Sequence, residues 1–490
     1  MKKTISGILI ICSLLSFQFV NAQSFKAEVG SLQNVDIGTP KFITDDGCFI
    51  FLDKVDNSLF LTVYDKNHKP LYIHKKLIFQ DQKKIESAVN IMWMSGYTMN
   101  TSRGVSYGGD MYQKSKSIYF NLFTFKKAFL IEIDFQHGTV VSETEVERTG
   151  IGNLIYNETK TKFASLVFQH SPKTETEFML KIYNINGQLI DDFKIDKSKA
   201  FFSSSACFLF QNDEIYVVSA ESGYQDHARD FKFFKCDLKT RKLSYGEIVI
   251  DKQNGFGSIE RVSDNTTDNS LIISWKYWYK KGNEYKRMIS RVDKSTLVNT
   301  TNKELANNKM VQLSKLDKKY KLKIPELINI VSDSKGNNTA LFFKHDYSLA
   351  EASAFGLSNF NNKVEELTAS IYKFDVKTDY EDFIRNIILL NGETKNYVFL
   401  NTIPDNFNLK LEDKPKKIRT LLGQKPIVIE VDEYGNTKEY YVFGNPSDED
   451  ESTYIEFRGA YYDKPSNTLI AKMFTESYAG KSKPVWIKLK

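Results

Sequence analysis

Hydrophobic and polar residues alternate along most of the chain in short runs that end at an aspartate or an asparagine. The run LTVYD, which ends at Asp65, is an example, and a second alternating run follows it after a few polar residues. Alternation with a period of two is typical of a half-buried β-strand. An Asp or Asn side chain opens a tight turn by capping backbone N–H groups two residues further on. Each occurrence therefore predicts a β-hairpin, and the turn residues are Asp65, Asp134, Asn184, Asp237, Asp293, Asp375 and Asp432.

These hairpins recur at intervals of 50 to 82 residues, and two more strand-like runs precede each of them. In the first repeat the two runs are PKFIT, which begins at Pro40, and CFIFL, which begins at Cys48. Four antiparallel strands in roughly every 50 to 60 residues are typical of a β-propeller blade. Tandem β-sandwiches would need about 100 residues and about seven strands per unit. The sequence therefore predicts an all-β fold, a single β-propeller of four-stranded blades.

The two ends of the chain supply one further blade between them. The run VWIKLK, from Val485 to Lys490, aligns with the third strand of a repeat and lacks its fourth. The segment FKAEVGSLQNVDI, from Phe25 to Ile37, contains a fourth strand that lacks the first three. Because an unpaired terminal strand exposes a row of backbone donors and acceptors, we expect the two strands to pair and close a ring of eight blades. Seven blades are the alternative, since residues 91–112 do not resolve into a clear first strand.

Two segments match the capping box of a helix N-terminus. SLAE, at Ser348–Glu351, predicts a short helix in a loop of the sixth repeat, and TNKE, at Thr301–Glu304, competes with the fourth strand of the fifth repeat.

Long connections gather on one side of the predicted ring. In a propeller, the connections between strands two and three lie on the same face as the connections between blades. The former are long in the fourth, sixth and seventh repeats, at residues 221–230, 344–366 and 404–425, whereas the turns of the opposite face are short. Long loops on one side of a rigid scaffold usually carry binding function, although such loops can also simply cover the mouth of the channel.

The residues that we expect to bind a ligand lie on this face. Asp226–His227 and His345–Asp346 combine imidazole and carboxylate, but neither pair has an evident third ligand, so we expect no metal. The run SWKYWYKKGNEY places Trp275, Tyr277 and Tyr279 on one strand face and Trp278 on the other. Such rings can stack on a sugar or a peptide, or pack between blades. The expected ligand-binding residues are Tyr224, His227, Arg229, Tyr277, Trp278, His345 and Asp346.

The first residues resemble a secretory signal peptide. Lys2 and Lys3 precede an apolar run, and small residues before Gln23 allow cleavage after Ala22. Residues 1–22 are therefore expected to be a signal peptide and residues 23–490 the mature β-propeller domain, exported to the periplasm or the cell exterior. Lipid attachment at Cys12 is the alternative, but Ile11 stands where a small residue is expected. No later segment is apolar enough to span a membrane.

Charge and cysteine content narrow the range of partners. The whole chain carries a formal net charge of +6, with acids and bases interspersed, which does not predict nucleic-acid binding. Cleavage would leave Cys48, Cys207 and Cys236, an odd number. Cys207 and Cys236 fall on the first and third strands of one blade, too far apart for a disulfide. We expect free thiols, no cofactor and a monomer.

One motif suggests catalysis. GVSYGG, at Gly104–Gly109, fits G-x-S-x-G and resembles the nucleophile motif of prolyl-oligopeptidase-type serine peptidases, which carry a propeller beside a hydrolase domain. In that family the motif joins a strand to a helix inside the hydrolase domain. Here the strand-like run DMYQKSKSIYFNLFTF follows it, and no stretch remains for such a domain. The motif therefore indicates a glycine-rich loop, and we expect no catalytic residues.

At the level of fold, the mature chain resembles the uncharacterised secreted β-propeller proteins of bacteria, a resemblance that rests on the repeat. Fold analogy alone does not carry function. The hypothesis from the sequence is a non-enzymatic binding propeller whose ligand is a glycan, a peptide or a protein. The alternative is a hydrolase or lyase that uses two carboxylates at the channel mouth. A surface-assembly component is a third class, which would require a large exposed apolar patch.

Overall fold

The computed structural model describes most of the chain from residue 25 onward. The described residues are 25–83, 85, 111–123, 127–147, 155–157, 159, 161–171, 174–200, 207–220, 230–249, 255–265, 269–279, 285–305, 309, 312, 326–332, 337–343, 352–376, 386–392, 395–410, 413–418, 423–442, 453–474 and 481–489.

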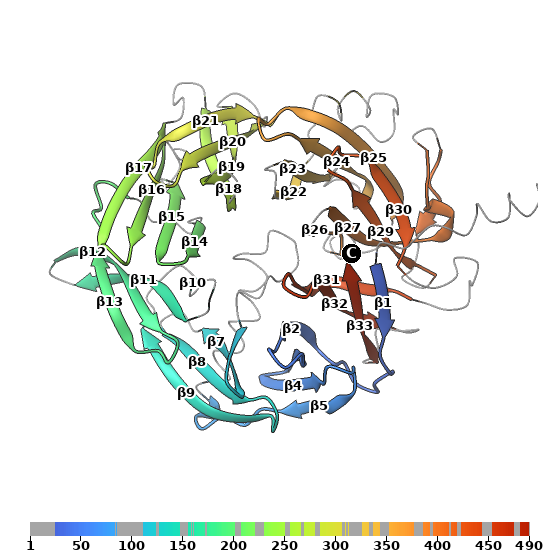
Figure 1. The fold of residues 1–490 in the computed structure, drawn as a ribbon, viewed down its shortest axis with the longest axis horizontal. Coiled ribbons are helices and arrows are strands. Elements are labelled where there is room, and N and C mark those ends of the chain that lie inside the picture. The colour runs from blue at the N-terminus through green and yellow to red at the C-terminus, as the bar shows by residue number, and fades with distance from the viewer. Residues whose placement is uncertain are drawn as a thin grey trace, which may run out of the picture.

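Eight antiparallel sheets stand around a central axis and follow one another in chain order (Figure 1). Blade 1 consists of β2 (Thr39–Ile43), β3 (Phe49–Val55), β4 (Ser58–Tyr64) and β5 (Pro70–Lys76), and blade 2 consists of β6 (Met111–Lys114), β7 (Ser117–Phe123), β8 (Lys127–Asp134) and β9 (Thr139–Glu147). Blade 3 consists of β10 (Ile155–Tyr156), β11 (Lys162–Ser171), β12 (Thr174–Asn184) and β13 (Leu189–Lys194), and blade 4 consists of β14 (Cys207–Gln211), β15 (Glu214–Ala220), β16 (Asp230–Asp237) and β17 (Lys242–Val249).

The remaining four blades include one sheet with an added fifth strand and one built from both ends of the chain. Blade 5 consists of β18 (Gly255–Asn265), β19 (Ser270–Tyr279), β20 (Tyr285–Asp293) and β21 (Asn299–Glu304), and blade 6 consists of β22 (Glu326–Ser332), β23 (Asn338–Phe343), β24 (Ala352–Phe360) and β25 (Glu366–Val376), with the added strand β28 (Lys417–Ile418). Blade 7 consists of β26 (Ile388–Asn391), β27 (Asn396–Thr402), β29 (Lys425–Val431) and β30 (Thr437–Tyr441), and blade 8 consists of β31 (Ile455–Asp463), β32 (Thr468–Phe474), β33 (Ser482–Leu489) and β1 (Phe25–Val29). The prediction of an eight-bladed β-propeller is confirmed.

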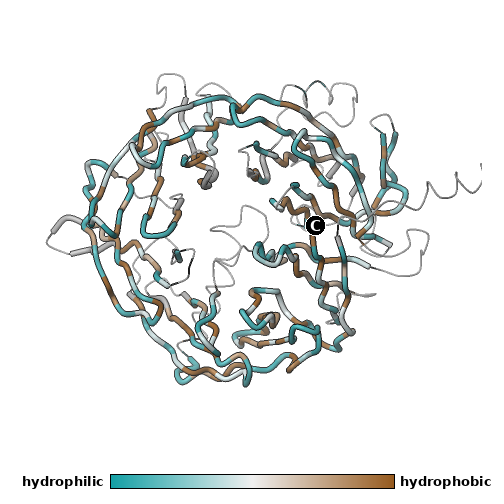
Figure 2. Tube along the Cα trace, in the orientation of Figure 1, coloured by the Kyte–Doolittle hydropathy of each residue, from teal (hydrophilic) through white to brown (hydrophobic). Residues whose placement is uncertain are grey.

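Burial follows the distance of a strand from the outer rim. The second and third strands of a blade are largely buried on both faces, as in β27, where every residue is buried. The outer strands are mostly exposed or half-buried, as in β13 and β21. Figure 2 shows the corresponding change from apolar residues on the inner strands to polar residues on the outer ones. Each sheet therefore packs both faces against its neighbours, and the core consists of the seams between blades.

The two ends of the described chain pair as the sequence predicted. β1 and β33 form an antiparallel ladder with five residue pairs, from Phe25 opposite Leu489 to Val29 opposite Val485. β33 is the third strand of blade 8, and β1 is its fourth. The ring is thereby closed without an unpaired strand between its first and last segments.

β33 contributes to the seams on both sides of blade 8. Val485, Ile487 and Leu489 are buried in the apolar cluster between blades 7 and 8. Trp486 points the opposite way, into the cluster between blades 8 and 1. By contrast, Ala27 is the described side chain of β1 that packs against the core, and Val29 remains 42% exposed. Of the described side chains in this strand pair, those of β33 therefore supply most of the buried apolar contacts, and β1 completes the backbone hydrogen bonds of β33.

The predicted hairpin turns have the expected side-chain caps. Asp65 Oδ1 accepts hydrogen bonds from the backbone N–H groups of Asn67 and Lys69, each at 2.8 Å. Five further predicted turn residues have the same cap, in which the side-chain Oδ1 accepts a hydrogen bond from the backbone N–H two residues further on. They are Asp134, Asn184, Asp237, Asp293 and Asp432.

Asp375 was wrongly assigned to a turn, because it lies inside β25, the fourth strand of blade 6. The hairpin of that blade opens at Asn361, whose Oδ1 accepts the N–H groups of Lys363 and Glu365 at 2.9 Å. Residues 352–360, assigned to a long loop from the sequence, form β24 and pair on both sides. The connection between strands two and three of blade 6 is therefore residues 344–351. The unusually long interval of 82 residues between predicted turns, from Asp293 to Asp375, arose because the turn of blade 6 was placed at Asp375 instead of Asn361.

The two predicted helices have different outcomes. Thr301–Glu304 lies within β21, where Thr301 pairs with Arg291 of β20, so the helix predicted there is wrong. Pairing with a neighbouring strand overrides the local capping pattern. Ser348–Glu351 lies outside the described residues.

Each of the seven described hairpin turns between strands three and four contains one residue with left-handed backbone. This residue is a glycine in three turns and carries a side chain in four, at φ between 50 and 80°. Left-handed backbone is costly for a residue with a Cβ, so a compensating contact is expected. The seven residues are His68, Gly138, Gly187, Arg241, Leu297, Val364 and Gly435.

The four that carry side chains insert them against the preceding blade. His68 stacks on Trp486 of blade 8, with ring centroids 3.8 Å apart. Arg241 binds a carboxylate of blade 3 through Nη1 at 2.6 Å. Leu297 and Val364 are buried in the clusters that blades 5 and 6 share with the blades before them. Burial of Leu297 and Val364, ring stacking of His68 and the ion pair of Arg241 thus offset the backbone cost.

Where the residue is a glycine, the preceding blade occupies the space of its missing Cβ. A Cβ on Gly138 would lie 2.9 Å from the Lys75 side chain of blade 1. A Cβ on Gly435 would overlap the hydroxyl of Thr368 in blade 6, which itself donates to the Gly435 carbonyl at 2.9 Å. The turns therefore latch each blade onto the one before it.

The longest connection of blade 7 runs to the outside of the ring. Residues 403–424, called the rim segment here, begin with the 3-10 turn η1 (Pro404–Asn406). Phe407 packs on Tyr441 of the outer strand β30, with ring centroids 4.2 Å apart. Further on, β28 pairs in parallel with the end of β25 in blade 6. The described part of the rim segment therefore joins the outer edges of blades 6 and 7, and Lys417–Ile418 is a strand within what the sequence indicated to be a long connection.

Cys207 and Cys236 lie on β14 and β16, which β15 separates, as the sequence predicted. Cys236 is a buried free thiol, and Cys48 is a half-buried one. Free thiols at all three positions remain a prediction. No helix among the described residues is long and apolar enough to cross a membrane.

Removal of Val485–Lys490 should destabilise the whole ring. The truncation deletes four side chains buried in two seams, Val485, Trp486, Ile487 and Leu489, and each contributes about 1.5 to 3 kcal/mol. Thermal melting and protease resistance of the truncated and full-length mature chains measure the loss. Removal of Phe25–Val29 is the matched truncation and should cost less. Unchanged melting after the C-terminal truncation would contradict closure through β33.

Substitution of Gly435 by alanine should destabilise the protein more than substitution of Gly423. Both glycines have left-handed backbone, with φ of 80° and 76°, so alanine meets the same backbone conformational cost at either position. A Cβ on Gly435 meets Thr368, whereas nothing lies within 4 Å of one on Gly423. We expect Gly435→Ala to cost about 1 to 3 kcal/mol more in denaturant unfolding. Equal losses would show that the turn does not latch blade 7 onto blade 6.

Candidate functional site

The structure describes two of the seven residues predicted to bind a ligand. Tyr277 and Trp278 are half-buried at the end of β19. Tyr224, His227 and Arg229 belong to the connection 221–229, and His345 and Asp346 belong to the connection 344–351. These five residues lie outside the described residues, as does GVSYGG at Gly104–Gly109.

The described strand ends that flank these two connections lie next to blade 5. β15 ends at Ala220 and β16 begins at Asp230, and the next residue, Phe231, packs edge-on against Trp275 of blade 5 at 5.1 Å. β23 ends at Phe343, and the ring of Phe342 lies 5.5 Å from the Arg287 guanidinium of blade 5. Blades 4, 5 and 6 are consecutive (Figure 1). The strands that flank these two connections therefore belong to blades next to blade 5, and the strand ends in question lie on the face that carries the connections between strands two and three, the loop face.

An aromatic ridge rises from the core of blade 5 toward the loop face. It consists of Trp275, Tyr277 and Tyr279, which lie on one side of β19. Trp275 is buried, and its Nε1 donates to Ser290 Oγ at 2.9 Å. Tyr277 stands edge-on to Trp275 at 6.3 Å, and Tyr279 stands edge-on to Tyr277 at 5.4 Å. The inner part of the ridge packs between blades 4 and 5, as the sequence allowed, and the outer rings are half-buried.

Two glycines of the innermost strand lie directly opposite the outer rings. Gly257 pairs with Tyr277, and Gly255 pairs with Tyr279. Residues directly opposite each other in an antiparallel pair share one face of the sheet. Because glycine has no side chain, β18 places none beside these two tyrosines on the channel side.

Two lysines lie near the aromatic rings at the end of β19, Lys286 on the side of the ridge and Lys276 on the other side, with Trp278. Lys276 Nζ lies 5.9 Å from the ring of Trp278, and Lys286 Nζ lies 5.7 Å from the ring of Tyr279. Lys286 also binds Glu304 at 3.1 Å. The Tyr279 side chain and the Glu304 carboxylate raise the pKa of Lys286 above its usual range, so its ammonium group remains charged at neutral pH.

Sequence reasoning missed Lys286, Glu304 and the two glycines. The strand register supplies the missing signal, since Lys286 lies opposite Tyr277 across the β19–β20 ladder. The GFG triplet at Gly255–Gly257 is visible in the sequence, but its register against the tyrosines is not.

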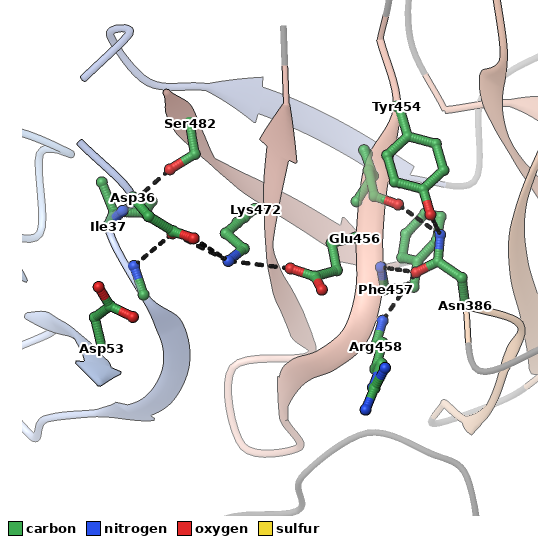
Figure 3. Close-up of polar contacts among 12 residues, drawn as sticks. Asp36, Ile37, Asp53, Asn386, Tyr454, Glu456, Phe457, Arg458, Lys472 and Ser482 are labelled. Atoms are coloured by element: carbon green, nitrogen blue, oxygen red, sulfur yellow. Dashed lines mark hydrogen bonds and ion pairs between the residues drawn. The ribbon is translucent and has the colours of Figure 1, made fainter. Parts of the chain in front are cut away.

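A second polar cluster fastens blade 8 to blade 1 (Figure 3). Lys472 of β32 is buried and binds Asp36 Oδ2 at 2.9 Å and Glu456 Oε2 at 3.1 Å. Asp36 lies between β1 and β2, and Glu456 lies near the start of β31. Burial alone would lower the pKa of Lys472, but the carboxylates of Glu456 and Asp36 outweigh it and raise this pKa. The lysine therefore remains charged and neutralises two half-exposed carboxylates at once.

Asparagines hold the other side of blade 8 (Figure 3). Asn386 Nδ2 donates to the Tyr454 hydroxyl and to the Ile455 carbonyl, each at 2.9 Å. Asn401 exchanges two hydrogen bonds with the backbone of Ile455, at 2.8 and 3.0 Å. Ser482 Oγ accepts from the Ile37 N–H at 3.1 Å on the blade 1 side. Blade 8 is thus tied to both neighbours by buried polar contacts near the loop face.

This second cluster bears on the idea of carboxylate catalysis. Asp36 and Glu456 are both engaged with one ammonium group, an arrangement that suits a structural clamp. Among the described residues, no group of three or more His, Cys, Asp or Glu side chains is placed to hold a metal ion.

The fold defines the chain as an eight-bladed β-propeller protein. No protein-family model and no curated protein matches it. Among solved structures, it is similar to a prolyl endopeptidase, with a TM-score of 0.42 and 9% sequence identity over 93% of this chain and 55% of that chain. It is also similar to the polysaccharide lyase Uly1, with a TM-score of 0.43 and 9% identity over 78% of this chain and 90% of that chain. A third similar structure is the WD40 domain of SCAP from fission yeast, with a TM-score of 0.39 and 8% identity over 95% of this chain and 98% of that chain. The chain spans about half the length of the prolyl endopeptidase. At these TM-scores and identities, the likenesses carry no argument about activity.

Substitution of Lys472 by methionine should destabilise the fold by about 3 kcal/mol, because it leaves two carboxylates side by side without their counter-charge. Lys26→Met is the matched control: Lys26 also binds a carboxylate, but its side chain is 74% exposed. Exposed ion pairs contribute little. Denaturant unfolding at neutral pH measures both variants. Equal, small losses would show that the Lys472 cluster does not fasten the seam.

Proposed function

We propose that this protein is an exported, non-enzymatic binding protein whose propeller binds a ligand on the loop face over blades 4 to 6. Export is supported by the sequence of residues 1–22, and the placement of the site is supported by the aromatic ridge. The ridge brings two outer tyrosines, half-buried, to the end of β19. Rigid aromatic side chains are efficient recognition groups, since they supply contact area at low cost in conformational entropy.

The proposal narrows the binding surface that the sequence predicted. Phe231, just after the long connection of blade 4, packs against Trp275 of the ridge, and Phe342, just before the long connection of blade 6, lies near Arg287 on the other face of the blade 5 sheet. The described rim segment of blade 7 instead packs on outer strands, so we do not include it in the site.

The alternative function, a hydrolase or lyase with two carboxylates at the channel mouth, has less support. Asp36 and Glu456 are two described carboxylates near the loop face, and both bind Lys472. Two carboxylates that share one buried ammonium group are not a pair left open to act as acid and base on a substrate.

Screening the mature protein on arrays of glycans and peptides tests the proposal, and Tyr279→Ala tests the site. We expect a captured ligand to bind the variant about tenfold more weakly, which corresponds to about 1.4 kcal/mol. Tyr434→Ala is the matched control, because Tyr434 is 69% exposed and lies in a hairpin turn on the opposite face. Equal affinity of both variants for every captured ligand would place binding elsewhere and overturn the proposal.

A further inference from the structure

We infer that residues 404–410 of the rim segment, called the strap here, dock on blade 7 more weakly as the pH rises, and that the Glu439 carboxyl is the group that responds. This inference is separate from the proposed function, because the rim segment lies outside the proposed site. It rests on how the strap is held, on what surrounds Glu439 and on which charges lie near that residue.

Two contacts hold the strap on β30, the outer strand of blade 7. The ring of Phe407 packs on the ring of Tyr441, with centroids 4.2 Å apart. The backbone N–H of Asn408 donates to Glu439 Oε2 at 3.1 Å. The later part of the rim segment is held separately, since β28 pairs with β25 of blade 6. The strap therefore docks on one aromatic ring and one carboxyl group.

Glu439 lies in largely apolar surroundings. It is half-buried in β30 and stands directly opposite Ile429, a fully buried residue of β29. Residues directly opposite each other share one face of the sheet, so Glu439 faces the seam between blades 6 and 7, where Tyr372 and Tyr441 pack. Burial raises the pKa of Glu439 above its ordinary range, and the N–H group of Asn408 opposes this shift only in part.

Lysines on the elements around Glu439 contact other groups. Lys416 of the rim segment binds the carboxylate of Asp405 at 2.8 Å. Lys373 of β25 donates to a backbone carbonyl of the rim segment. Lys438 points to the opposite face of β30, because neighbouring residues of a strand face opposite sides of the sheet. Within the described part of the chain, Glu439 thus has its hydrogen bond to the strap and no ion pair.

The two tyrosines beside Glu439 stay neutral. Burial, and after it the charges of Glu439 and Asp405, raise the pKa of Tyr441 to about 12. Burial also raises the pKa of Tyr372, and the charge of Glu439 adds to that shift. Both hydroxyls therefore remain protonated over the range in which a carboxyl titrates, and Glu439 is the group that changes its charge beneath the strap.

The direction of the response follows from these surroundings. A protonated Glu439 is neutral, whereas its ionisation leaves a half-buried carboxylate without a counter-charge. When the strap undocks, water reaches the carboxyl and its pKa returns to the ordinary range. Docking is therefore strongest below that range and weakens as the pH rises through the raised pKa of the docked state. Release of the strap uncovers the Tyr441 ring at the rim of the propeller.

Hydrogen exchange of the strap, measured by mass spectrometry on the mature chain at about pH 5 and about pH 8 and corrected for the intrinsic rate at each pH, tests the inference. The wild-type strap should be at least about threefold less protected at the higher pH. Glu439→Gln keeps an acceptor for the Asn408 N–H but carries no charge, so it should abolish the difference and raise protection at the higher pH. Asp405→Asn is the matched control, because Asp405 is an acid of the same strap whose side chain is 51% exposed, and it should keep the difference.

Two further measurements make each outcome decisive. Phe407→Ala should undock the strap at both pH values, and it gives the protection of the undocked state. Thermal melting of every variant identifies losses that come from global unfolding. Equal protection of the wild-type strap at both pH values, or a difference that survives in Glu439→Gln, would overturn the inference. Loss of the difference in Asp405→Asn would assign the response to Asp405 and overturn it as well.

Discussion

The pairing of β1 with β33 is the contact on which the rest of the ring depends. Each blade is a thin sheet that buries its faces only against its two neighbours, so an open ring would leave one seam uncovered. The chain closes that seam with five residue pairs and with a strand whose side chains alternate between two clusters, Ile487 toward blade 7 and Trp486 toward blade 1. Neither β1 nor β33 contains a cysteine, so backbone hydrogen bonds and side-chain packing hold these two strands together.

Buried polar groups are concentrated around the same blade. Lys472 joins Asp36 and Glu456, and Asn386 and Asn401 hold the start of β31. Such groups add little net stability compared with apolar packing, because their desolvation is costly. They do fix geometry, since a shifted blade would leave a charge or an amide buried without its partner. We interpret this cluster as the element that sets the position of blade 8, and the apolar clusters as the source of its stability.

The same face of the ring serves two purposes in different blades. In blade 7, the connection between strands two and three turns outward and joins the rims of blades 6 and 7 through β28 and Phe407. In blades 4 and 6, described residues that flank the corresponding connections contact blade 5, Phe231 at Trp275 and Phe342 at Arg287. A rigid ring with latched hairpin turns holds the end of β19 at a fixed place, which is the condition for a pre-organised binding site.

The sequence alone predicted the blade architecture, the pairing of the chain ends and the side-chain caps of six hairpins, because period-two patterning and a cap two residues away can be read along the chain, but it left seven blades as an alternative to the eight of the structure. Only the tertiary structure decided that blade 6 turns at Asn361 instead of Asp375, and that Thr301–Glu304 is strand. It also decided that Lys286 lies beside Tyr279. These features depend on which distant segments pair and in which register, and the free energy of that pairing outweighs the local preferences that a sequence displays.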